Sequence, residues 1–210
     1  MSTDLPQPVT HLADQVIQLL TMRANDLGLD SATLASIRPN ANVPPAHLPV
    51  LGQLHGFRSI ANAETTGVVD AVLDAAPHLP WRQTYSADDG FARDYLDRSG
   101  WFDLAGPAGP YSADGVRIMI GCWGQGIVYP DHSHPPDEYY LVLAGGARFR
   151  LRDEPWQDLG PGEIFHTPSH AVHSADMSER PLMALAIWRA NDLAVRINLT
   201  DRDRNVVLPD

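Results

Sequence analysis

The sequence of 210 residues contains no lysine, so all 15 of its basic residues are arginines. Enzymes that form a Schiff base on a lysine, pyridoxal-phosphate enzymes and P-loop kinases all require that amine. The composition therefore excludes these three classes.

Cysteine is almost absent as well. The single cysteine, Cys122, cannot form an internal disulfide and lies in an apolar run, which favours a buried, inert thiol over a nucleophile. The first residues lack the basic start and apolar core of a signal peptide, and no run approaches the ~18 apolar residues of a membrane span. We therefore predict a cytoplasmic protein without a membrane partner.

Positive charge is scarce, since the formal net charge is −11. Nucleic-acid binding needs clustered cations, and the chain has no basic recognition helix, so we predict no nucleic-acid partner. A cationic or zwitterionic small molecule suits this charge better as a substrate.

The first half of the chain has helical periodicity. Apolar residues with helical spacing predict an amphipathic helix over residues 11–27, with Thr10 as its cap and Gly28 as its stop signal. Residues 29–56 contain four prolines and are predicted to form a loop with a short helix at its start. Further helices are predicted over residues 64–76 and 91–98.

The periodicity changes to that of strands from Tyr111 onward. We predict strands over residues 116–123, 139–143, 147–152, 164–167, 172–175 and 182–188, separated by glycine-rich turns. Many short strands are typical of a sandwich or barrel. The prediction is a mainly β protein in which a helical region, residues 1–110, packs on a β-barrel domain, residues 111–210.

Four residues with even numbers, His132, His134, Glu138 and Tyr140, would share one face of an extended strand pair if the register survives the intervening turn. About thirty residues later, a Gly-Pro-Gly turn leads to a short apolar run that ends at His173. Three imidazoles and a carboxylate suit one divalent transition metal ion, with zinc, iron, manganese and nickel all open. His166 and His170 lie in the same stretch, and either could replace His173 or support it from outside the ligand set.

The spacing of these residues resembles the two metal motifs of the cupin superfamily. The first motif is matched by Gly126, His132, His134, Glu138 and Gly145, and most of the second by Gly162, Pro168 and His173. The resemblance implies a double-stranded β-helix, or jelly-roll barrel, with His132, His134, Glu138 and His173 as ligands. His170 stands where the second motif usually has glycine, and Met177 where it usually has asparagine.

Among cupins, the chain resembles the dimethylsulfoniopropionate (DMSP) lyase family. The resemblance rests on Tyr129, Tyr140, the long helical first half and segments between about residues 81 and 192. It implies a carbon–sulfur lyase that splits a zwitterion by metal-assisted β-elimination into dimethyl sulfide and acrylate, with Tyr140 or Tyr129 as the base. Cupins also pair through strands, which implies a homodimer.

A sulfonium group needs a site that accepts positive charge without strong hydration. Aromatic faces provide about 0.5–2 kcal/mol each for this purpose. Trp123 and Trp188, with Trp81 and Tyr85, are therefore the candidate substrate-binding walls.

Two other functions remain open at this level. The same ligand set supports oxygen chemistry in iron-dependent cupin dioxygenases, and other cupins bind small molecules without turnover. Oxygen consumption would identify the first, and ligand binding without product would identify the second.

Overall fold

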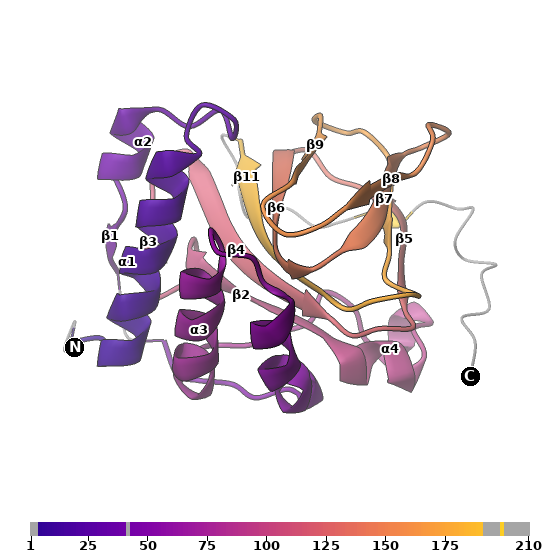
Figure 1. Ribbon diagram of the computed structural model, residues 1–210, viewed down its shortest axis with the longest axis horizontal. Coiled ribbons are helices and arrows are strands. Elements are labelled where there is room, and N and C mark those ends of the chain that lie inside the picture. Colours follow the sequence, from indigo (N-terminus) through magenta and orange to yellow (C-terminus); the bar gives the residue numbers. More distant parts are fainter. Residues whose placement is uncertain (1–3, 41–42, 191–197, 200–210) are drawn as a thin grey trace.

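The computed structural model describes residues 4–40, 43–190 and 198–199 of the chain. Within these residues, two β-sheets face each other around a barrel interior, and the N-terminal helices cover the outer face of the larger sheet (Figure 1). This arrangement confirms the predicted mainly β fold with a helical N-terminal part.

The larger sheet has the strand order β1-β3-β2-β4-β11-β6-β9. Its strands are β1 (Arg38–Pro39), β2 (Ser99–Ala105), β3 (Tyr111–Ser112), β4 (Val116–Trp123), β6 (Asp137–Gly145), β9 (Ile164–Thr167) and β11 (Leu182–Arg189). Neighbours are antiparallel except β2 and β3, which pair in parallel. In the centre, β11 pairs with β4 along its whole length and with β6 on its other side.

The smaller sheet has the order β12-β5-β10-β7-β8. Its strands are β5 (Val128–Ser133), β7 (Ala147–Leu151), β8 (Gln157–Leu159), β10 (His173–Asp176) and β12 (Asn198–Leu199). On β7, Ala147 and Phe149 are buried and Arg148 is exposed, as the alternation in the sequence predicts.

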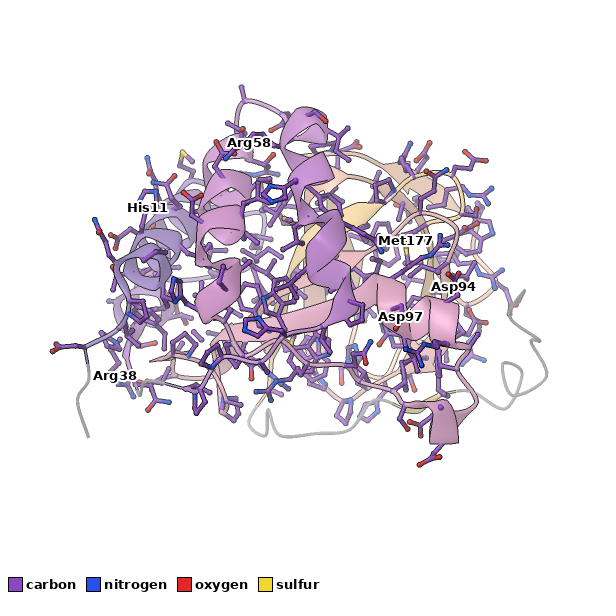
Figure 2. All side chains as sticks on the ribbon, turned by 90° about the horizontal axis from the view of Figure 1, so that it is seen from below. His11, Arg38, Arg58, Asp94, Asp97 and Met177 are labelled. Atoms are coloured by element: carbon purple, nitrogen blue, oxygen red, sulfur yellow. The ribbon has the colours of Figure 1, made fainter. Side chains whose placement is uncertain are left out.

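The helical layer consists of α-helices and 3-10 helices that precede most of the strands. They are α1 (Gln7–Met22), α2 (Ser31–Ala35), η1 (Pro49–Ile60), α3 (Thr66–Ala75), η2 (Ala76–His78), η3 (Ala87–Asp89) and α4 (Arg93–Arg98). In a view from below, Arg58 lies on η1, and Asp94 and Asp97 lie on α4 (Figure 2). In the described part of the chain, no helix has the length and apolar character needed to cross a membrane.

Strands of the larger sheet contribute side chains to two hydrophobic cores, one beneath the helices and one inside the barrel, because successive side chains point to opposite faces. On β4, Ile118 and Ile120 pack with the helices, whereas Met119 and Trp123 pack inside the barrel. The barrel interior is the core that contains the site.

The first helix begins earlier and ends earlier than predicted. α1 starts directly after Pro6, because proline is tolerated in the first turn of a helix, and it ends at Met22. Thr10 lies inside the helix, where its hydroxyl donates to the carbonyl oxygen of Gln7, so its prediction as a cap was wrong. Gly28 does adopt the left-handed conformation, at φ 61°, but it ends the turn that follows α1, so its prediction as the stop of this helix was wrong.

Most other predicted elements lie close to their observed positions, but the 3-10 helix η1 begins at Pro49, inside the region predicted as loop over residues 29–56. The strands over 116–123 and 164–167 have the predicted bounds, and the helix predicted over 64–76 is α3. Two longer strands, β2 and β5, were missed. In β2, polar residues do not alternate and Asp103 interrupts a short apolar run, while β5 contains Pro130, which argues against a strand. The larger sheet therefore includes two strands that precede residue 111, β1 and β2.

Candidate active site

Two neighbouring strands of the smaller sheet supply the histidines. His132 lies on β5 and His134 directly follows that strand, while His173 begins β10 and is paired with His132 across the antiparallel ladder. The pairing brings the ring centroids of His132 and His173 to 4.0 Å. All three side chains are buried.

The tautomer of each histidine is set by the backbone. Every Nδ1 faces the carbonyl oxygen of a residue two positions away: Pro130 for His132 at 2.7 Å, Pro136 for His134 at 3.0 Å and Ala171 for His173 at 3.0 Å. A carbonyl oxygen can only accept a hydrogen bond, so each Nδ1 carries the proton. In the neutral ring, each Nε2 is then left with a free lone pair.

These Nε2 atoms converge on one point. The three histidines each offer a ligand atom, and the three atoms lie within 4.8 Å of one another. Among the described residues, Nε2 of His132 and Nε2 of His173 have no hydrogen-bond partner. Buried nitrogen atoms that are left unpaired are costly, and a bound cation would satisfy them.

Glu138 closes this group from the larger sheet. It lies near the start of β6, and its Oε2 is 2.9 Å from Nε2 of His134 and 3.3 Å from Nε2 of His173. Burial alone would raise the pKa of this carboxyl, but the neighbouring imidazoles hold the pKa well below its usual value. The buried carboxylate is therefore ionised.

The charge of Glu138 acts on the imidazoles in return. Burial lowers the pKa of His134, but the Glu138 carboxylate outweighs burial, so the pKa is raised above its usual value. For His132, burial lowers the pKa well below the usual value, and the nearby His173 adds to this shift. His132 therefore stays neutral at physiological pH.

The residues present fit a divalent transition metal ion. Three neutral imidazole nitrogens and one carboxylate oxygen are a donor set that suits zinc, iron, manganese or nickel, and their backbone partners fix the ring orientations. The ligand set predicted from the sequence is thus brought together in space.

The second carboxylate oxygen has a different partner. Nε1 of Trp188 on β11 donates a hydrogen bond of 2.6 Å to Oε1 of Glu138. Trp188 and Glu138 are directly opposite in the β11–β6 ladder, which places both side chains on the interior face of the sheet.

A cavity of about 980 Å³ opens beside these groups. Its inner wall includes five of the candidate site residues, which are Tyr85, Trp123, Tyr129, Tyr140 and Trp188, together with Glu138. The same cavity is also lined by the exposed Asp88 and Asp89, the half-buried Arg82 and Trp101 and the buried Arg117.

The two candidate bases reach the cavity by different routes. Tyr140 is two residues after Glu138 on β6, so it shares the interior face. Tyr129 is three residues before His132, so regular alternation along a strand would point the two side chains to opposite faces. A register shift removes this difference, because the three residues from Tyr129 to His132 on β5 lie opposite only two on β10. This bulge turns Tyr129 to the same side as His132, on which its ring stacks at 3.9 Å.

Both tyrosines are protonated in the protein as it stands. Burial raises the pKa of each well above its usual value, and the Glu138 carboxylate raises that of Tyr140 further. The hydroxyl of Tyr129 lies 3.4 Å from that of Tyr85.

The structure does not bring Trp81 to the cavity. Its ring packs edge-on against Phe102 in the core beneath the helices, and its Nε1 donates to the carbonyl oxygen of Ala76. Trp81 follows the prolines that end the helix predicted over residues 64–76, so no periodicity in the sequence indicated which core its ring would join.

His166 and His170 do not join the ligand atoms. The His166 side chain is 43% exposed and pairs with Asp137 on the outside of β6. His170 adopts φ 62°, which explains why the motif usually has glycine there, and its backbone N–H donates to the carbonyl oxygen of His134.

A buried ion pair in the cavity wall was not expected from the sequence. Arg117 on β4 donates to both carboxylate oxygens of Asp103 on β2, at 2.6 and 3.2 Å. The sequence did contain a signal for this ion pair, because each of two otherwise apolar segments carries a single charge. Charged residues that are buried are almost always paired.

A cupin barrel with a buried three-histidine site suited to a metal ion defines this protein as a metal-binding cupin. Within that class, the chain belongs to the dimethylsulfoniopropionate lyase family, whose model matches residues 27–184. The match begins nearer the N-terminus than the motifs in the sequence suggested.

Individual relatives agree with the family. The chain is 32% identical over 150 residues to dimethylsulfoniopropionate lyase DddQ of Ruegeria pomeroyi, which covers 71% of this chain and 74% of that protein. The crystal structure of DddQ from Ruegeria pomeroyi DSS-3 is 28% identical, with a TM-score of 0.81 over 93% of this chain and 98% of that one. A crystal structure from work on the DMSP lyases RdDddP and RnDddQII is 31% identical, with a TM-score of 0.82 over 92% and 97% of the two chains.

Proposed function

We propose that this protein is a metal-dependent lyase that cleaves DMSP by β-elimination into dimethyl sulfide and acrylate. The observation that carries the proposal is the convergence of three Nε2 atoms beside the ionised Glu138 in an aromatic cavity, in a member of the DMSP lyase family.

In this reaction, a base removes a proton from the carbon next to the substrate carboxylate. The electron pair of that C–H bond forms the double bond of acrylate, and the pair of the C–S bond leaves with sulfur as neutral dimethyl sulfide. A divalent ion held by His132, His134, Glu138 and His173 supplies Lewis-acid stabilisation of the charge that develops on the substrate carboxylate.

A tyrosine is the proposed base, and the cavity offers two. Tyr140 lies on the face of β6 that carries Glu138, and Tyr129 stacks on His132, so each is next to a ligand residue. Since burial raises the pKa of both phenols, a compensating positive charge at the ligand group is needed before either can accept a proton.

The sulfonium end of the substrate is proposed to contact the aromatic inner wall. Trp123 and Tyr129 lie with their ring centroids 6.1 Å apart, and Tyr85 meets Tyr129 edge-on at 6.0 Å. Faces of this kind attract a weakly hydrated cation by about 0.5–2 kcal/mol each.

The proposal is tested by supplying DMSP to the purified protein loaded in turn with each candidate metal, and by measuring dimethyl sulfide in the headspace and acrylate in solution. We expect equal amounts of the two products, and a loss of about 100-fold or more in kcat for the Tyr140→Phe or the Tyr129→Phe variant, whichever removes the base.

Tyr139→Phe is the matched control, because Tyr139 is adjacent in sequence but stacks on His166 on the outer side of β6. The proposal fails if the folded, metal-loaded protein releases no dimethyl sulfide, and the tyrosine base fails if both interior variants retain full kcat.

A homodimer and a cytoplasmic location remain predictions, which size-exclusion chromatography and cell fractionation would check.

A further inference from the structure

A row of interior side chains crosses the larger sheet beside the ligand group. Trp188 on β11 is directly opposite Arg117 on β4 on one side and directly opposite Glu138 on β6 on the other. Residues that are directly opposite in antiparallel strands have neighbouring Cβ atoms, so their side chains meet.

Neighbouring side chains hold Arg117 and Trp188 in place. The Arg117 guanidinium lies 5.3 Å from the centroid of the Trp188 ring and 5.0 Å from that of Trp101, and the buried Asp103 carboxylate binds it at 2.6 Å. The Trp188 ring also lies 4.6 Å from the ring of His134. The plane of the indole, and therefore the direction of its N–H, is held from the side of the sheet away from Glu138.

The two oxygens of Glu138 consequently have different surroundings. Oε1 accepts the 2.6 Å hydrogen bond from Trp188, whereas Oε2 faces the nitrogens of His134 and His173. With Oε1 engaged, Oε2 is the oxygen presented to the point on which the histidines converge.

We infer that Trp188 is a positioning residue that holds Glu138 as a one-oxygen ligand, and that the Arg117–Asp103 ion pair braces its indole ring. This role differs from that of a wall for the sulfonium group. The inference rests on the metal site of the proposed function, but it does not depend on the identity of the substrate.

The physical basis is the control of ligand geometry by a neighbouring donor. Hydrogen bonds to metal ligands orient them, and their removal typically weakens metal binding about 10- to 100-fold. A carboxylate without the indole donor would be free to rotate, and its buried Oε1 would be left without this partner.

The experiment measures the affinity of the protein for zinc alone, by competition with a chromophoric chelator. We expect Trp188→Phe to raise the Kd for zinc about 10- to 100-fold, because phenylalanine keeps the aromatic ring but lacks the N–H donor. Trp156→Phe is the matched control: Trp156 is 37% exposed between β7 and β8, where its ring lies against the guanidinium groups of Arg148 and Arg150 and takes no part in bracing Trp188. Its Kd should be unchanged.

A second measurement needs no folded Trp188 variant. In the wild-type protein labelled with ¹⁵N, the indole N–H signal of Trp188 should shift on addition of zinc, while that of the exposed Trp156 should not. The chain contains 5 tryptophans, so phenylalanine variants of the others assign the Trp188 signal by elimination.

Unchanged zinc affinity in folded Trp188→Phe, or an indole signal that does not respond to zinc, overturns the inference. If the wild-type protein binds no zinc, manganese, iron or nickel, the metal site itself fails, and the inference fails with it. If Trp188→Phe weakens zinc binding but DMSP is not cleaved, the positioning role stands and the proposed substrate fails.

Discussion

At the scale of single residues, the site depends on one buried carboxylate. Glu138 is ionised because the imidazoles around it favour its charge, and it makes His134 more basic in return. His132, which is more strongly governed by burial, stays neutral. The pKa values of these two histidines are therefore shifted in opposite directions, upward by the Glu138 carboxylate for His134 and downward by burial for His132.

This difference predicts how metal binding responds to pH. A proton and a metal ion compete for Nε2 of His134, and since its pKa is raised, this competition begins at a higher pH than for an ordinary imidazole. Below the pKa of His134, we expect zinc affinity to fall about tenfold per pH unit, because one proton must be displaced. Calorimetric titrations at a series of pH values would measure the slope, and an affinity that is flat through the range of an ordinary histidine would contradict the prediction.

At the scale of secondary-structure elements, the turn after β6 determines how the two sheets are joined. Gly145 ends β6 at φ 68°, and a Cβ atom at this position would lie 1.9 Å from the carbonyl oxygen of Pro181. A side chain is therefore excluded by backbone strain and by a contact with backbone that cannot move aside.

We expect Gly145→Ala to lower the free energy of unfolding by at least about 1–3 kcal/mol, the usual range for a strained backbone residue. Chemical denaturation would measure the change. Gly56→Ala is the control, because nothing lies within 4 Å of a Cβ atom built at Gly56. Equal stability of the two variants would show that the turn relaxes at no cost.

Elements with a clear periodicity, or with a long apolar run, could be predicted. β7 was found because buried and exposed residues alternate along it, and α3 because apolar residues recur at helical spacing. β4 is buried on both faces and was found as an apolar run instead. β2 was missed because both of its faces are buried, so polar residues do not alternate along it, and because Asp103 interrupts its short apolar run. The bulge in β5, which brings Tyr129 to the site, leaves no signal in the sequence.

At the scale of the whole molecule, the ligand group joins the two sheets. His132, His134 and His173 come from the smaller sheet and Glu138 from the larger one, so a bound ion would link both walls of the barrel. Binding to the folded state alone stabilises a protein, by about 2.7 kcal/mol at a ligand concentration 100 times Kd.

We therefore expect zinc at that concentration to raise Tm by about 5–10 °C for a chain of this length, and a chelator to reverse the change. Differential scanning calorimetry would measure both. His134→Ala should lose the response to zinc, whereas His166→Ala, which removes a partly exposed histidine outside the ligand group, should keep it. A response that survives in His134→Ala would place the stabilising ion elsewhere.

The sequence by itself determined the ligand types, their spacing and the mainly β fold, because those follow from local periodicity and from motif residues that stay close in the chain. Tertiary structure decided the rest. Register across β4, β11 and β6 placed Trp188 against Arg117 and Glu138, and the pairing of β2 with β4 brought Asp103 to Arg117. Packing against the helices placed Trp81 in the core. These contacts join residues far apart in the chain, and only the packing of one sheet against its neighbours fixes which of them meet.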